Sequence, residues 1–136
     1  MASEREKICL ENFEQKLRQS PGSLKAKNGI CQLYKDYISI NEYPRLSFRH
    51  PENPKNVSSV TVGSMVTMVE LKTVSLPKGF DSSHICHNKP CILRQHISFE
   101  PHRVNLQRQI CVSEGRCLGH GSYADCLVHL KVHACK

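Results

Sequence analysis

Cysteine and histidine residues gather in one part of this chain, and this limits its possible folds more than any other feature. Eight cysteines and eight histidines occur in 136 residues, and most of both lie between His84 and Cys135. The chain has no Trp and only 6% aromatic residues, so it is poor in core-forming side chains. We expect one domain whose small core is supported by disulfides or by metal sites.

Zinc is favoured over disulfides because the cysteines are interleaved with histidines, which zinc sites use and disulfide frameworks do not require. The first ten residues are charged and lack the apolar segment of a secretory signal. The most apolar stretch, residues 60–74, contains Ser, Thr, Glu and Lys and is too polar to span a membrane. We therefore expect an intracellular protein, nuclear or cytoplasmic, neither secreted nor bound to a membrane. A secreted disulfide-linked ligand is the alternative, and counts of zinc and free thiols decide between the two.

The N-terminal half has the patterns of ordinary secondary structure. Apolar residues recur every fourth position from Cys9 to Leu17, which predicts an amphipathic helix over residues 3–19. Residues 29–34 and 45–49 are predicted strands, separated by a turn-prone segment.

Two more helices are predicted further along the chain. Met65 and Met68 have helical spacing within residues 64–72, and we expect this face to be core. Later, Ser98 or Glu100 can cap a helix that has Pro101 in its first turn.

Asn105 and Arg108 lie three residues apart on this last predicted helix and therefore share a face. The Asn105 amide oxygen could bind a hard cation, and the Arg108 guanidinium could neutralise a phosphate. A solvated polar face is the simpler alternative.

Three soft or borderline metal ligands follow the spacing C-x4-C-x4-H at Cys86, Cys91 and His96. A tetrahedral structural zinc needs a fourth ligand, and Cys31 on the predicted early strand is our candidate. Such a site would tie the N-terminal sheet to this loop.

The segment Ser83 to Asn88, followed by Cys91, His96, Asn105, Arg108 and Cys111, resembles the His-Cys box homing endonucleases. These belong to the His-Me finger (ββα-metal) nucleases, and the resemblance covers residues 31–126. It implies that His84 is the general base, that Asn105 binds a single catalytic Mg²⁺, and that Arg45 contacts the scissile phosphate, with Arg49 as the second candidate. His102 is a rival for the catalytic histidine.

The resemblance also implies a second zinc site behind the catalytic helix. Its candidate ligands follow the spacing C-x5-C-x2-H-x5-C, which differs from that of the family. The candidates are Cys111, Cys117, His120 and Cys126, with His129, His133 and Cys135 as possible substitutes.

The sequence thus predicts an α+β fold with an N-terminal helix, an early antiparallel sheet, a ββα-metal core and two structural zincs. We expect an Mg²⁺-dependent endonuclease acting on double-stranded DNA; the net charge of +7 agrees with such a partner, and a homodimer is left open. The alternative is an inactive zinc-stabilised DNA-binding module, similar to a transcription factor. The expected organisation is one domain over 1–136, with a helix in 1–22, a DNA-contacting sheet in 28–80, the nuclease core in 81–126 and a tail in 127–136.

Overall fold

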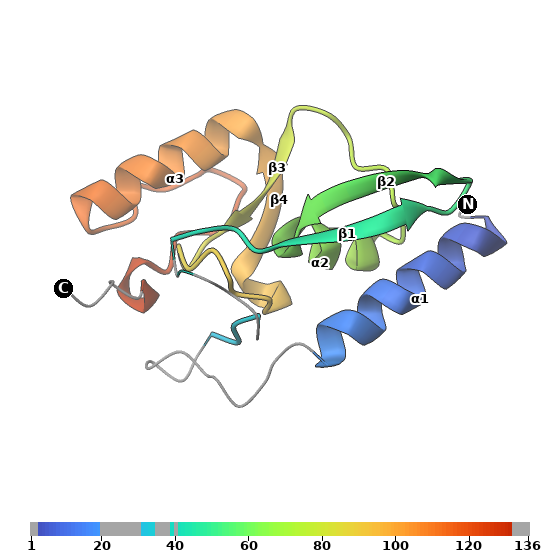
Figure 1. Cartoon of the computed structure of the whole chain (residues 1–136). Helices are drawn as coiled ribbons and strands as arrows, with labels where there is room; N and C mark the ends of the chain where they lie inside the picture. The colour runs from blue at the N-terminus through green and yellow to red at the C-terminus, as the bar shows by residue number, and fades with distance from the viewer. Residues whose placement is uncertain (1–2, 20–30, 35–38, 40, 132–136) are drawn as a thin grey trace.

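The structure is a computed structural model that describes residues 3–19, 31–34, 39 and 41–131 (Figure 1). Its helices are α1 (Glu4–Gln19), α2 (Val62–Leu71) and α3 (His102–Glu114), with 3-10 turns η1 (Arg94–His96) and η2 (Val128–Leu130). Its strands are β1 (Arg45–His50), β2 (Asn53–Thr61), β3 (Phe80–His84) and β4 (Ile97–Pro101).

The predicted N-terminal helix is confirmed as α1. Its apolar stripe places Leu10 and Phe13 in a core shared with Met65 of α2. The Phe13 ring also meets Phe48 of β1 edge to face, with ring centroids 4.9 Å apart. Burial of this stripe holds α1 beneath the first strand pair, as Figure 1 shows.

Strands β1 and β2 form an antiparallel pair whose register matches Arg45 with Thr61. Leu46 and Phe48 are partly buried, whereas the side chains that alternate with them along β1 are exposed. The predicted strand at 45–49 is therefore confirmed. Of the strand predicted at 29–34, residues 29 and 30 lie outside the described residues. In the described remainder, Gln32 and Leu33 are bridge residues, and Leu33 pairs with Cys91.

Helix α2 confirms the helix predicted at residues 64–72 but begins two residues earlier than expected. The Thr61 hydroxyl accepts a hydrogen bond from the Ser64 amide at 3.1 Å, which caps the helix. Met65 is fully buried, so the methionine face is core as predicted.

Strands β3 and β4 pair in antiparallel register, with His84 opposite Ile97, and α3 follows β4 directly. This strand–strand–helix unit confirms the expected ββα core within an α+β fold. The capping prediction at Ser98 or Glu100 is wrong, because both residues lie in β4 and Pro101 occupies the cap position without a side-chain hydrogen bond.

None of the described helices is long and apolar enough to cross a membrane.

Candidate functional site

The first group of metal-ligating side chains consists of Cys31, Cys86, Cys91 and His96, all buried, with ligand atoms within 4.8 Å of one another. His96 Nδ1 lies 3.4 Å from Cys31 Sγ and 3.6 Å from Cys91 Sγ. A tetrahedral zinc with ordinary Zn–S and Zn–N bonds separates such atoms by about 3.5 Å. The distances therefore match a closed zinc site.

The fold brings these four residues together from distant parts of the sequence. Cys86 follows the end of β3, and His96 is the last residue of η1. The bridge between Leu33 and Cys91 brings the segment that contains Cys31 next to them. Fully buried Asn88 supports the group, because its Nδ2 donates to Cys31 Sγ at 3.3 Å and to the Leu130 carbonyl at 2.8 Å. Such outer contacts orient metal ligands.

The second group lies at the C-terminal end of α3 and in the loop behind it. Its ligand atoms, from Cys111, Cys117, His120 and Cys126, again lie within 4.8 Å of one another. His120 Nε2 is 3.4 Å from Cys111 Sγ and 3.3 Å from Cys126 Sγ. The structure thus brings together the first-choice ligands of this site.

The possible substitutes do not enter this group in the part of the chain that the structure describes. His129 is exposed on η2 and is not among its ligand atoms. His133 and Cys135 lie outside the described residues.

The chemistry of both groups fits zinc. A hydrogen bond with Cys31 raises the pKa of Cys91 to about 12, and burial raises that of Cys126 to about 12. A cation bound beside these sulfurs favours their thiolate form, and three thiolates with one imidazole are a usual zinc set. The described cysteines are all free thiols, so these two sites support two structural zinc ions.

Arg108 is not available to bind phosphate, which corrects the sequence-based suggestion. Its side chain is 1% exposed, and its Nε and one terminal nitrogen each donate to a Glu100 carboxylate oxygen at 2.7 Å. The other terminal nitrogen donates to Cys126 Sγ at 3.3 Å. Arg108 therefore joins β4 and α3 to the second zinc site.

His84 ends β3 and is buried beside the first zinc site. Its Nε2 lies 2.8 Å from the Cys91 carbonyl oxygen. A carbonyl only accepts, so Nε2 carries the proton and Nδ1 keeps a lone pair. Among the described residues, the buried Nδ1 has no hydrogen-bond partner. Burial lowers the pKa of His84 to about 4, so the imidazole is neutral near pH 7.

Asn105 lies on α3 and lines the same cavity as His84, of about 200 Å³. Tyr43 also lines it, with its ring centroid 6.0 Å from that of His84. A neighbouring cavity of about 260 Å³ shares Asn105 and Tyr43 and includes Asp81. The base and metal candidates therefore face one hollow between β3 and α3.

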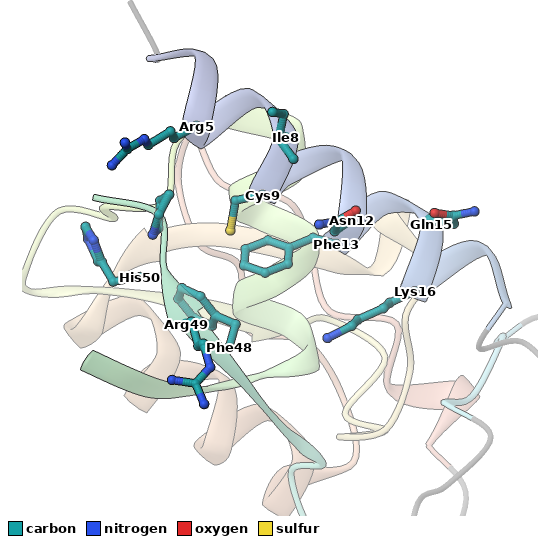
Figure 2. Close-up of a pocket in the computed structure, with 11 residues that line it drawn as sticks. Arg5, Ile8, Cys9, Asn12, Phe13, Gln15, Lys16, Phe48, Arg49 and His50 are labelled. Carbon is teal, nitrogen blue, oxygen red and sulfur yellow. The ribbon is translucent and has the colours of Figure 1, made fainter. Parts of the chain in front are cut away.

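Arg45 is not part of the walls of these two cavities. Its guanidinium donates to the Ser59 hydroxyl at 2.9 Å and to the Ser59 carbonyl at 2.7 Å, on the exposed face of β1 and β2. Arg49, the second candidate, lines a groove of about 590 Å³ between α1 and β1 (Figure 2). Phe13 and Phe48 also line this groove, whereas His84, Asn105 and Arg45 do not.

The rival histidine, His102, occupies the first position of α3 and is largely exposed. Its Nδ1 lies 2.6 Å from an Asp81 carboxylate oxygen. His102 does not line the cavity that contains His84.

Sequence reasoning missed two residues beside the catalytic candidates. Gly63, in the first turn of α2, packs so closely that an added Cβ would lie 3.0 Å from His84 Cε1. Asp81 accepts a hydrogen bond from Asn105 Nδ2 at 2.9 Å. The sequence signal for the contact of Gly63 with His84 was a glycine early in a helix. The sequence contained no signal for the contact between Asp81 and Asn105.

Comparison with known families gives a match to the zinc-binding loop region of homing endonuclease, over residues 27–133. Searches of curated proteins and of solved structures found no match. The matched region spans more than three quarters of the chain and contains all eight zinc ligands. The chain therefore belongs to the family defined by the zinc-binding loop region of homing endonucleases.

Proposed function

We propose that this protein is an Mg²⁺-dependent DNA endonuclease that hydrolyses phosphodiester bonds with one metal ion and His84 as the general base. The observation that carries the proposal is the state of the His84 imidazole. Its protonated nitrogen is held by the Cys91 carbonyl, while the other nitrogen keeps its lone pair beside the cavity that Asn105 lines.

A general base must be neutral at working pH and held in one orientation. Burial keeps the His84 imidazole neutral, and the hydrogen bond to Cys91 fixes its tautomer. Cys91 is itself a candidate ligand of the first zinc site, so a zinc bound there would help to fix the carbonyl that orients the base. In the proposed reaction, Nδ1 removes a proton from the water that attacks phosphorus.

Asn105 would hold the magnesium ion through its amide oxygen, which is the kind of ligand that Mg²⁺ accepts. The amide nitrogen donates to Asp81, which leaves the oxygen for another partner. The bound ion would neutralise negative charge on the phosphate and on the departing 3′ oxygen.

DNA is the proposed substrate because basic side chains lie in the hollow and on the first strand pair. Lys89 and Lys131 line the cavity that contains His84. Arg45, Arg49 and Lys55 are exposed on the β1 and β2 pair. We propose that this strand face binds the phosphate backbone, and that Arg45 leaves Ser59 to contact the phosphate to be cleaved.

The alternative is a DNA-binding module without catalysis. The observation that favours it is the family match, whose description concerns the zinc-binding loop region and no catalytic residue. Both functions predict zinc and DNA binding, so only cleavage separates them.

The test is nicking of supercoiled plasmid by zinc-loaded protein, with Mg²⁺ either added or left out. Chelators are avoided because they would also remove the structural zincs and unfold the domain. We expect Mg²⁺-dependent nicking that Asn105→Ala abolishes and that Ser113→Ala, an exposed change on the same helix, leaves intact. DNA binding without nicking at any Mg²⁺ concentration would refute the endonuclease and leave the binding module.

A further inference from the structure

A carboxylate lies directly beside the proposed magnesium ligand. Asp81 belongs to β3, three residues before His84, and its Oδ2 accepts a hydrogen bond from Asn105 Nδ2 at 2.9 Å. The same oxygen lies 2.6 Å from His102 Nδ1. The Asp81 side chain is 31% exposed, so this junction of β3 and α3 is partly shielded from water.

The contact decides which way the Asn105 amide faces. The terminal torsion of asparagine is soft, and its oxygen and nitrogen can exchange places at low cost. An ionised carboxylate only accepts hydrogen bonds, so the amide nitrogen must face Asp81. The amide oxygen, which a hard cation would bind, is therefore turned away from Asp81.

Asp81 also supplies the charge that an amide lacks. Mg²⁺ sites in proteins normally use one or two carboxylates, and Asn105 is a neutral ligand. Asp81 and Asn105 line the same cavity of about 260 Å³. A cation at the Asn105 oxygen would therefore sit close to a negative charge, in a region where water screens it less than at an open surface.

We infer that Asp81 is a positioning residue of the magnesium site, which orients the Asn105 amide oxygen toward the ion and adds negative charge beside it. His102 Nδ1 contacts the same carboxylate oxygen at 2.6 Å and helps to hold it in place. This inference rests on the proposed function, because it assigns a role within the same metal site.

The test measures metal binding directly. Mn²⁺, a paramagnetic substitute for Mg²⁺, is titrated into zinc-loaded protein with duplex DNA and followed by electron paramagnetic resonance. The titration uses a His84→Ala background, in which cleavage of the DNA is expected to be about 10²–10⁴-fold slower. The Mn²⁺ binding that is lost in Asn105→Ala is assigned to the proposed magnesium site. Zinc content and circular dichroism establish that each variant is folded.

Asp81→Ala should weaken Mn²⁺ binding about 10–100-fold, as loss of a group that orients a metal ligand commonly does. In the otherwise unchanged protein, it should raise the Mg²⁺ concentration for half-maximal nicking by a similar factor, and saturating Mg²⁺ should restore most of the rate. Asp81→Asn keeps an acceptor for Asn105 but loses the charge, so its effect should be smaller. It also serves as the second variant if Asp81→Ala does not fold. Glu114→Gln removes an exposed charge at the far end of α3 and should change neither measurement.

The outcomes separate this inference from the proposed function. If the parent protein nicks DNA but both Asp81 variants bind Mn²⁺ as it does, the inference is overturned and the endonuclease stands. If the parent never nicks but Asp81→Ala weakens Mn²⁺ binding at the Asn105 site, the endonuclease fails and the inference stands. If Asn105→Ala removes no Mn²⁺ binding, Asn105 is not the metal ligand and the inference is overturned, while nicking by the parent still decides the endonuclease.

Discussion

Replacing Gly63 with alanine should slow DNA cleavage without unfolding the protein. The new Cβ would lie 3.0 Å from His84 Cε1 and 3.6 Å from its Nε2. Carbon atoms in contact prefer about 3.5–4.0 Å, so the imidazole must move by roughly 0.5–1 Å. A misplacement of about 1 Å in a catalytic group can cost about 100-fold in rate, so nicking should fall about 10–100-fold.

Stability should hardly change, because two effects of this substitution oppose each other. Alanine is favoured over glycine within a helix by about 1 kcal/mol. Straining the hydrogen bond from His84 to the Cys91 carbonyl can cost up to the net contribution of that bond to stability, about 0.5–1.5 kcal/mol. The melting temperature should therefore stay within about 5 °C of the parent's.

The assay compares initial nicking rates at saturating Mg²⁺ with thermal melting and zinc content. Glu70→Ala is the matched control, because it lies later in α2 and loses only an exposed ion pair with Arg94. Its nicking rate should equal the parent's. If Gly63→Ala nicks as fast as the parent, α2 does not position His84, and the reasoning from this close contact is refuted.

Three further predictions concern zinc, the interior and DNA. Cys31→Ser should lose zinc from the first site and unfold at a lower temperature, because structural zinc contributes about 10–16 kcal/mol of apparent binding free energy. Full zinc occupancy of this variant in native mass spectrometry would contradict the assignment of Cys31 as a ligand. Glu100→Ala should lower the free energy of unfolding in urea by about 3–5 kcal/mol, because it leaves the buried Arg108 guanidinium unpaired. The control Glu14→Ala breaks an exposed ion pair and should cost under about 1 kcal/mol, so equal losses would contradict the argument. DNA affinity should fall steeply with salt, and Arg45→Ala should reduce the slope of log K against log salt by about 0.9; an unchanged slope would show that Arg45 contacts no phosphate.

The zinc sites could be predicted because the types of residue and their spacing in the sequence identify candidate zinc ligands. Cys86, Cys91 and His96 lie close together in sequence, so a loop brings them to one ion. Cys31 is distant in sequence, and the requirement for a fourth ligand, together with the resemblance to the His-Cys box family, pointed to it. The ββα unit followed from the resemblance, whereas apolar periodicity predicted α1, β1 and α2.

The interior around α3 could not be predicted, because spacing does not tell which face of a helix turns inward. Asn105 and Arg108 share a face by spacing, yet Asn105 lines a cavity while Arg108 is buried against Glu100. Glu100 was expected to cap the start of the helix, whereas its side chain is fully buried in β4. Its partner became visible only once β4 and α3 were packed together.

The contacts of Gly63 and Asp81 could also not be predicted from the sequence. Each depends on the packing of β3 against a helix, α2 in the first case and α3 in the second. An isolated glycine or aspartate has no neighbour in sequence that would mark such a role.

The most direct test of the proposed mechanism is the nicking rate of His84→Ala at saturating Mg²⁺, with and without added imidazole. We expect the rate to fall by about 10²–10⁴, the usual contribution of a general base, while two zincs per chain and DNA affinity are retained. Because the side chain occupied a buried position at the cavity, imidazole in solution should restore part of the rate. If His84→Ala cuts DNA as fast as the parent, His84 is not the base and the mechanism is wrong.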